Sequence, residues 1–349
     1  MKKIIILSLM TIVLIGVVNA QDTIKIRTGD SQIAEQRYNE GVKLLQNGDL
    51  QNAISKFTDA IQLKPDLAKA YYNRGVAKSE VGLFDEAITD LDQALKYEAN
   101  ALYYYTRGKI KQDKGDLDGA LQDYNVAINI NKDLPEAYYY RASLYFDKGE
   151  YTNAIDDLKQ AISRKNSYAY AYNDLGSCYL MLEDYDNAIY YYKQAVGADP
   201  RLTLAYNNLG TTYRKMKKYD EAIIEYSKAI DFDPDYVIAI NNRGVAKLEK
   251  GDIEGAIKDF SEAIRKKSDY QFAYNNRGIA KYKIEDYQSA LEDFNEAIEL
   301  DSNYAIAYLN RANTKEMLRD MSGACEDWKK AADLGISSAE IYHKQLCNK

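Results

Sequence analysis

The sequence is dominated by a pattern that recurs every 34 residues. Its clearest copy, Thr203–Tyr236, reads TLAYNNLGTTYRKMKKYDEAIIEYSKAIDFDPDY. Apolar residues within 204–215 and 220–231 have the i, i+3, i+4 spacing of one helix face, which predicts two amphipathic helices, A and B. Nine such repeats, all of 34 residues except the second, which has 33, begin at Ala34, Ala68, Ala101, Pro135, Ala169, Thr203, Val237, Gln271 and Ala305. Because each repeat can bury its apolar surface only against its neighbours, we expect an all-α solenoid of antiparallel helix pairs.

Residue size is fixed at several places in the repeat, numbered here with Gly210 at position 8. Position 8 is glycine or alanine throughout, and positions 20 and 27 are alanine in all nine repeats. Small residues let helices A and B approach closely, and a large residue at position 24 fills the gap between them. The residues at position 24 are Phe57, Leu91, Tyr124, Leu158, Tyr192, Tyr226, Phe260, Phe294 and Trp328.

These positions match those of a known family. Thr203–Tyr236 carries, at positions 4, 8, 11, 20, 24, 27 and 32, the residues Tyr206, Gly210, Tyr213, Ala222, Tyr226, Ala229 and Pro234. The pattern resembles the tetratricopeptide repeat (TPR) and covers residues 34–336. The resemblance implies a right-handed superhelix whose A helices line a concave groove, and members of the family mostly bind peptides or proteins there.

The first 20 residues have a different character. Lys2 and Lys3 precede an apolar run of about 15 residues, Ile4–Val18, which is short for a bilayer span of about 20. With small residues up to Ala20, this predicts a cleaved signal peptide over 1–20; an uncleaved membrane anchor is the alternative. We therefore expect an exported, bacterial TPR protein of the periplasm or cell exterior, without stable membrane insertion after cleavage. Residues 21–33 are expected to form a loose polar lead-in.

Composition restricts the partners and the chemistry. The chain has 46 basic and 53 acidic residues, a net charge of −7 that becomes −9 once the two leader lysines are removed. This balance argues against nucleic acid or an anionic membrane as a partner. The sequence has one histidine and lacks a glycine-rich phosphate loop, a metal-ligand cluster and a nucleophile–base set. We therefore expect no enzymatic activity, no cofactor and no bound metal.

Matched charges at positions 7 and 23 predict contacts between helices A and B. Six repeats have arginine at position 7 and aspartate at position 23, and repeat 1 reverses the signs with Glu40 and Lys56. Where position 7 is leucine, in repeats 5 and 6, position 23 is Tyr191 or Glu225. Structural ion pairs explain this better than catalytic acids. The predicted pairs are Arg74–Asp90, Arg107–Asp123, Arg141–Asp157, Arg243–Asp259, Arg277–Asp293 and Arg311–Asp327.

The C-terminal segment, 337–349, is predicted to cover the last repeat. Ser337 or Ser338 can cap a short helix that ends near Leu346. If this helix runs antiparallel to the last B helix, Cys347 lies near Cys325, and an oxidising compartment favours a disulfide between them. The third cysteine, Cys178, is expected to be a small buried residue.

The expected groove carries amides and tyrosines, mainly at positions 5 and 6. In the family, position 6 faces the groove, and here it is asparagine in six repeats: Asn39, Asn73, Asn208, Asn242, Asn276 and Asn310. This ladder resembles the repeat arm of O-linked N-acetylglucosamine transferase, where asparagines hold a peptide backbone. An amide both donates and accepts, as a peptide unit does. The ladder is interrupted at Thr106, Tyr140 and Asp174. The alternative is that these asparagines contact only water or cap neighbouring helices.

Position 5 divides the array into two halves. It is Tyr38, Tyr72, Tyr105 and Tyr139 in repeats 1–4, and Asn173, Asn207, Asn241 and Asn275 in repeats 5–8. We expect an aromatic half-groove followed by an amide half-groove, with apolar position-2 residues in the second half. The tyrosines offer large contact area, or stacking surfaces for sugars; alternatively they only pack between A helices.

Together these patterns favour a non-enzymatic scaffold that binds an extended peptide or a partner helix in its groove. A carbohydrate-binding or polysaccharide-handling envelope module is the alternative, supported by the tyrosines. Self-assembly is a third possibility.

Overall fold

The computed structural model describes the backbone of residues 20–347 and the side chains of residues 29–347. Residues 20–347 form helices joined by short turns and contain no strand. The predicted signal peptide lies almost entirely outside these residues. Two compact units divide the chain after Arg141, within one helix, and we consider each separately. None of the described helices has both the length and the apolarity needed to cross a membrane.

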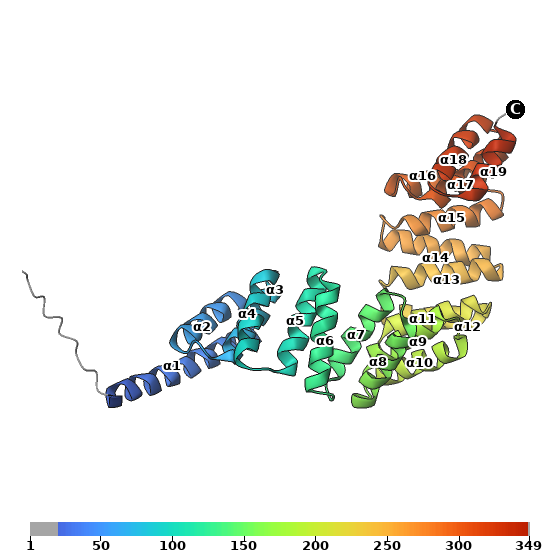
Figure 1. The fold of residues 1–349 in the computed structure, drawn as a ribbon. Helices are drawn as coiled ribbons and strands as arrows, with labels where there is room; N and C mark the ends of the chain where they lie inside the picture. The colour runs from blue at the N-terminus through green and yellow to red at the C-terminus, as the bar shows by residue number, and fades with distance from the viewer. Residues whose placement is uncertain (1–19, 348–349) are drawn as a thin grey trace, which may run out of the picture. The chain divides into compact units, whose positions relative to one another are not determined.

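Figure 1 shows consecutive antiparallel helix pairs in each unit. Unit 1 contains α1 (Ala20–Gln46), α2 (Leu50–Leu63), α3 (Ala68–Glu80), α4 (Phe84–Tyr97), α5 (Ala101–Lys114) and α6 (Leu117–Ile130). The boundary falls within α7 (Pro135–Asp147). Unit 2 continues with α8 (Tyr151–Arg164), α9 (Ala169–Met181), α10 (Tyr185–Ala198), α11 (Thr203–Lys215), α12 (Tyr219–Phe232), α13 (Val237–Lys250), α14 (Ile253–Lys266), α15 (Gln271–Lys283), α16 (Tyr287–Leu300), α17 (Ala305–Met317), α18 (Met321–Asp333) and α19 (Ser337–Leu346).

The odd-numbered helices α1–α17 are the A helices and the even-numbered helices α2–α18 are the B helices. From the second repeat onward, each A helix begins at the first residue of its repeat. The first A helix differs, because α1 begins at Ala20 instead of Ala34. The prediction of a loose lead-in over 21–33 is therefore wrong. Adding turns to an existing helix costs much less than nucleating one, so α1 can extend ahead of the packed repeat.

In six repeats the interior has a glycine at position 8 against an aromatic ring at position 24. The alanines at positions 20 and 27 are fully buried, as Ala222 and Ala229 illustrate. A Cβ atom added to Gly210 would lie 2.7 Å from the ring of Tyr226, so a ring at position 24 requires glycine at position 8 in this repeat. In repeat 4, where position 24 is Leu158, position 8 is Ala142.

Candidate binding surface on the A helices

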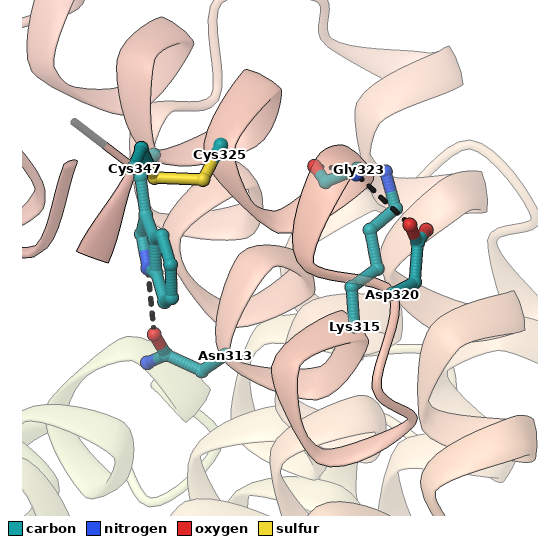
Figure 2. Close-up of a disulfide and its surroundings, with 7 residues drawn as sticks. Asn313, Lys315, Asp320, Gly323, Cys325 and Cys347 are labelled. Atoms are coloured by element: carbon teal, nitrogen blue, oxygen red, sulfur yellow. Dashed lines mark hydrogen bonds between the residues drawn. A yellow bond between two sulfur atoms is a disulfide. The ribbon is translucent and has the colours of Figure 1, made fainter. Parts of the chain in front are cut away.

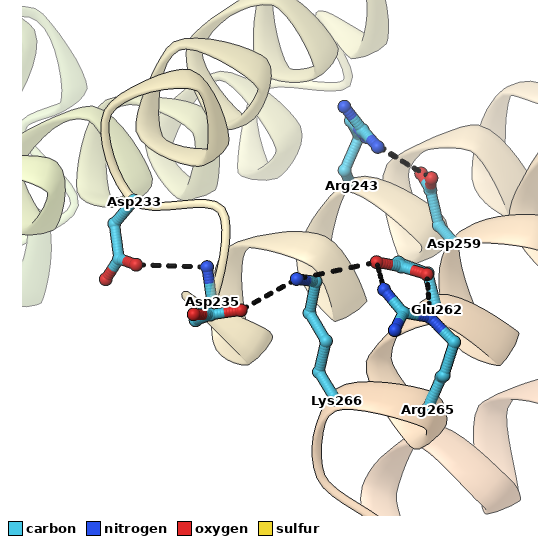
Figure 3. Close-up of polar contacts among 7 residues, drawn as sticks. All are labelled: Asp233, Asp235, Arg243, Asp259, Glu262, Arg265 and Lys266. Carbon is cyan, nitrogen blue, oxygen red and sulfur yellow. Dashed lines mark hydrogen bonds and ion pairs between the residues drawn. The ribbon is translucent and has the colours of Figure 1, made fainter.

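The predicted ion pairs join helices A and B within single repeats. In five repeats the arginine at position 7 forms two parallel hydrogen bonds to the aspartate at position 23, with N–O distances of 2.6–3.0 Å. Figure 3 shows the Arg243–Asp259 pair. In repeat 1, Lys56 Nζ lies 3.2 Å from Glu40, with the charges reversed as expected. Arg141 and Asp157 belong to different units, so their pairing stays a prediction.

Each of these five aspartates has a second cation, which the prediction omits. A lysine at position 11, one turn after the arginine, lies 2.8–3.0 Å from the same carboxylate. These lysines are Lys78, Lys111, Lys247, Lys281 and Lys315. Two cations around a nearly buried aspartate satisfy most of its lone pairs. Part of this signal is visible in the sequence, since position 11 is lysine in five of the six repeats with arginine at position 7 and is tyrosine in repeats 4, 5 and 6.

The arginine at position 7 also links successive repeats. Its Nη1 donates to position 25 of the preceding B helix, for example from Arg243 to Ser227 at 3.1 Å and from Arg107 to Asp92 at 2.5 Å. The other acceptors are Thr58, Asn125, Ser261 and Asn295. Before the leucine-bearing repeats 5 and 6, position 25 is instead Lys159 or Lys193. This matched variation across repeats could also have been read from the sequence.

Repeat 5 replaces the ion pair with an aromatic contact. Tyr179 and Tyr191 stack with ring centroids 5.4 Å apart and an interplanar angle of 6°. The ammonium of Lys159, from the preceding B helix, lies 5.8 Å from the centroid of Tyr179. In repeat 6, Leu209 is buried beside Tyr192 and Tyr213. In both repeats, helix A and helix B therefore pack at positions 7 and 23 without a buried carboxylate.

In unit 2 the two asparagine rows bind each other. The side-chain amide at position 6 donates to the amide oxygen at position 5 of the preceding repeat, at 2.9–3.0 Å in four successive junctions. The junctions are Asn208 to Asn173, Asn242 to Asn207, Asn276 to Asn241, and Asn310 to Asn275. This chain of amides connects α9, α11, α13, α15 and α17.

Unit 1 uses the same register with other groups. Asn73 at position 6 donates to the hydroxyl of Tyr38 at position 5 of the preceding repeat, at 2.9 Å. Tyr72 and Thr106 have hydroxyl oxygens 3.4 Å apart, and the rings of Tyr105 and Tyr140 have centroids 5.7 Å apart. Position 5 therefore meets position 6 of the next repeat in both units.

These contacts change the expected groove. The position-5 asparagines Asn207, Asn241 and Asn275 are 3–6% exposed, so the prediction that they line an open groove is wrong. The position-6 asparagines of α11, α13, α15 and α17 are half-buried, and part of each amide is already hydrogen-bonded within the protein. In unit 1, Tyr72, Tyr105 and Asn73 are half-buried in packing contacts, as is Tyr139, whereas Asn39 is exposed. The sequence signal for this arrangement is that every repeat with asparagine at position 5 is succeeded by a repeat with asparagine at position 6.

Next to the amide chain, unit 2 exposes a row of apolar side chains at position 2. Their exposed fractions range from 37% for Leu204 to 52% for Tyr170. We call these five residues the apolar row: Tyr170, Leu204, Ile238, Phe272 and Ile306. In unit 1, position 2 of the first two repeats is instead the ion pair Glu35–Lys69, whose ammonium lies 4.4 Å from the centroid of Tyr38.

Position 9 supports the interior side chain at position 24. The hydroxyls of Ser177 and Thr211 bond those of Tyr192 and Tyr226 at 3.0 and 3.1 Å. Burial raises the pKa of both tyrosines, which keeps them neutral. In the last repeat the indole of Trp328 donates to the Asn313 side chain at 2.9 Å (Figure 2). In these three repeats the position-9 side chain therefore satisfies the polar group of the buried residue at position 24.

The C-terminal helix covers the last repeat and is covalently attached. Cys325 in α18 and Cys347 after α19 form a disulfide, with a Cα–Cα distance of 5.7 Å (Figure 2). Ala339 and Cys347 pack in the cluster around Trp328. The N-cap of α19 is Ile336, which makes no side-chain cap bond, so the prediction of a serine cap is wrong. Packing and the disulfide hold this helix instead.

The remaining candidates for chemistry are few. Cys178 is fully buried, and burial raises the pKa of its thiol to about 12, so it is a neutral packing residue at physiological pH. Among the residues that the structure describes, no group of three or more His, Cys, Asp or Glu side chains is arranged to hold a metal ion.

The helix pairs, the size match at positions 8 and 24 and the junction register define an α-solenoid of two-helix repeats. TPR sequence profiles match residues 41–82, 68–100, 108–149, 139–202, 203–236 and 272–304. The chain belongs to the tetratricopeptide repeat family.

Two curated proteins resemble short parts of the chain. Tetratricopeptide repeat protein 36 of Mus musculus is 43% identical over 56 residues, which are 16% of this chain and 30% of that protein. The Xenopus tropicalis protein of the same name is 40% identical over 65 residues, 19% of this chain and 32% of its own length. The chain thus spans about a third of the curated relatives it matches.

Solved structures share the fold. Yeast Tom70 is 18% identical, with a TM-score of 0.51 over 94% of this chain and 90% of that one. PilF of Pseudomonas aeruginosa is 19% identical, with a TM-score of 0.53 over 60% of this chain and 97% of that one. A tetratricopeptide repeat protein of Parabacteroides merdae is 19% identical, with a TM-score of 0.50 over 81% and 99% of the two chains.

Proposed function

We propose that this protein is a non-enzymatic binding scaffold, and that the A helices of unit 2 bind an extended peptide or a partner helix. The observation that carries the proposal is the apolar row, five exposed side chains repeated at one position of successive A helices. Isolated exposed apolar residues are ordinary, but a row of them along one face indicates an interaction surface. The half-buried amides at position 6 lie on the same helices and supply polar contacts to a bound backbone.

The experiment uses a displayed library of random peptides as the probe. The wild type is compared with a triple variant of the apolar row, Leu204→Glu, Ile238→Glu and Phe272→Glu. A matched control changes three exposed apolar residues on B helices, Tyr190→Glu, Ile224→Glu and Phe232→Glu. We expect peptides selected by the wild type to bind the row variant at least about tenfold more weakly, a loss of about 1.4 kcal/mol, and the control unchanged. Equal binding to all three proteins would exclude the apolar row as the site.

The location of the scaffold is a separate proposal. We propose that it is exported, because residues 1–20 have the pattern of a signal peptide and because disulfides persist in oxidising compartments. The disulfide between Cys325 and Cys347 is consistent with such a compartment. Sequencing the N-terminus of the protein from bacterial cell fractions tests this. A mature N-terminus near Gln21 in the periplasm or medium is expected, and an intact Met1 in the cytoplasm would contradict it.

A further inference from the structure

Unit 1 contains a cavity between the A helices of its second and third repeats, and this cavity shares no residue with the apolar row. It lies between α3, α4 and α5, and every residue that lines it belongs to unit 1. Its volume is about 460 Å³, and small-molecule sites have roughly 300–1,000 Å³. The cavity is therefore large enough for a small ligand or for one unit of a larger one.

The cavity depends on a short side chain, Ser79, at position 12. The other eight repeats have a larger residue there: leucine, glutamine, phenylalanine, arginine, tyrosine or glutamate. The Ser79 hydroxyl donates to the Val76 carbonyl of its own helix at 2.8 Å, which holds the side chain against α3. At the equivalent junction of unit 2, between α15 and α17, position 12 is Tyr282 and the cavity has only about 70 Å³. A small residue at position 12 thus leaves the space open.

Much of the cavity wall is apolar. Val76, Phe84 and Ile110 contribute aliphatic and aromatic surface. Tyr72 also lines the cavity, and its ring stacks on that of Tyr103 with centroids 4.6 Å apart. This packing fixes the Tyr72 ring within the protein. Aromatic and aliphatic walls of this kind pack well against the C–H groups of a ligand.

Three charged side chains line the same cavity without an ion pair. Glu80 and Asp113 are exposed, and Lys109 is half-buried. Within the part of the chain that the structure describes, none of the three forms a hydrogen bond or a salt bridge, and the Lys109 ammonium lies 5.9 Å from the centroid of Tyr140. Lys109 is the one charged residue at position 9 in the nine repeats. The cavity therefore offers a ligand both an ammonium donor and carboxylate acceptors.

This combination favours a neutral ligand with several hydroxyl groups. An anion meets the field of the carboxylates and a cation that of the ammonium, whereas a hydroxyl group can accept from the ammonium and donate to a carboxylate. A peptide backbone is a poorer match, because position 6 at this junction is Thr106 instead of asparagine. Its hydroxyl oxygen lies 3.4 Å from that of Tyr72.

We propose that this cavity binds a saccharide unit, a second binding activity that does not depend on the peptide binding proposed for unit 2. The C–H groups of the sugar pack against Tyr72, Val76 and Ile110, and one of its hydroxyl groups accepts from the Lys109 ammonium. A further hydroxyl group donates to a carboxylate of the lining.

The probe is an array of immobilised oligosaccharides of defined composition, applied to the wild type and four variants. Ser79→Leu copies position 12 of repeats 1, 5 and 7 and fills the cavity, and Ser79→Ala, which keeps the cavity, is its matched control. Lys109→Val copies position 9 of repeats 1, 2 and 7 and removes the ammonium. The triple variant of the apolar row is the control in unit 2. Each variant is checked for unchanged helical circular dichroism.

We expect the wild type to bind a defined set of oligosaccharides and Ser79→Leu to lose this binding, because the leucine occupies the space of the sugar. Lys109→Val should weaken binding about tenfold, as for the loss of one hydrogen bond to a charged group. Ser79→Ala and the apolar-row variant should bind as the wild type does.

Two results would overturn the inference: no oligosaccharide bound by the folded wild type, or equal binding by the wild type and Ser79→Leu. Neither result would affect the peptide binding proposed for unit 2. If Ser79→Leu instead lost the peptides that the wild type selects from the displayed library, the cavity would belong to the peptide site and the saccharide assignment would be wrong.

Discussion

The A helices of the two units meet in one register but through different chemistry. In unit 1 a tyrosine at position 5 accepts from or packs against position 6 of the next repeat, as in Tyr38 with Asn73. In unit 2 a nearly buried asparagine accepts instead, as in Asn275 with Asn310. The repeat geometry thus fixes which positions meet, and the side chains that fill the junction are free to vary as matched pairs.

The units also differ in the exposed side chains at position 2, which lie near position 5 on the A helices. A tyrosine is long enough to reach position 2, where Lys69 lies over Tyr38 and pairs with Glu35. An asparagine is short and stays in the junction, and in unit 2 the exposed position-2 residues are apolar. We assign binding to unit 2 because five successive A helices there carry an exposed apolar residue at position 2, whereas in unit 1 only one described position-2 residue, Leu102, is both apolar and exposed.

The two units differ where successive A helices meet, but both contain the same ion pairs between helix A and helix B. The largest predicted effect tests whether these ion pairs stabilise both units equally. Arg243→Leu should destabilise unit 2 by about 3–4 kcal/mol, because it leaves the nearly buried Asp259 with Lys247 alone. Arg74→Leu should cost a similar amount in unit 1, where Asp90 has the same two cations. Urea denaturation followed by circular dichroism measures both.

The control for this prediction imitates repeat 5. Arg243→Leu combined with Asp259→Tyr and Lys247→Tyr reproduces Leu175, Tyr191 and Tyr179, which need no buried charge. The triple variant should recover most of the lost stability. If the single variants lose less than about 1 kcal/mol, the pairs behave as surface ion pairs and the buried-carboxylate argument does not hold.

The second effect concerns the end of unit 2, where α17 is the last A helix among the residues that the structure describes. Position 5 there is Leu309, which packs in the Trp328 cluster with Cys347, close to α19. Replacing both Cys325 and Cys347 with serine should cost up to about 3 kcal/mol, the loop-closure contribution of a disulfide of this span. Fluorescence of Trp328, the one tryptophan of the chain, reports the exposure of this end.

Reduction of the wild type with dithiothreitol provides the comparison for this variant. It should produce the same change in Trp328 emission and in urea midpoint as the double serine substitution. An unchanged midpoint in both cases would mean that packing of Ala339 and Ile336 alone holds α19.

Much of this molecule could be predicted from the sequence, because a repeat supplies its own internal comparison. The fixed alanines at positions 20 and 27 defined the helix pairs, and the joint variation of positions 7 and 23 indicated contacts such as Arg243–Asp259. The proximity of Cys325 and Cys347 followed from the antiparallel arrangement of α18 and α19.

The amide junctions illustrate what the sequence analysis missed. Positions 5 and 6 are adjacent, so both asparagines were assigned to the groove by their place on helix A. Adjacent helical residues point about 100° apart, and Asn207 is directed into the junction while Asn208 is half-exposed. The sequence analysis also missed a cavity of about 180 Å³ between α7, α8 and α9, lined in part by Leu158 and Cys178. A cavity of this kind has no sequence motif, because its size depends on how the three helices pack.

The third prediction breaks an amide junction in unit 2. Asn275→Leu removes the oxygen that accepts from Asn310 at 2.9 Å, at a site only 3% exposed. We expect a loss of about 2 kcal/mol, because the Asn310 amide loses its partner where water has limited access. Urea denaturation measures the loss, and hydrogen exchange should localise it to α15 and α17. Asn39→Leu, at an exposed position 6, is the control and should be nearly neutral.

The smallest effect belongs to the equivalent junction in unit 1. Tyr38→Phe removes only the hydroxyl that accepts from Asn73, and both residues are half-buried. Water can replace the lost acceptor and the ring keeps its contact with Phe57, so the cost should stay below about 1 kcal/mol. A loss as large as that of Asn275→Leu would show that the phenol and amide junctions are equally dependent on their hydrogen bond. The distinction between a packed junction in unit 1 and a hydrogen-bonded one in unit 2 would then have to be abandoned.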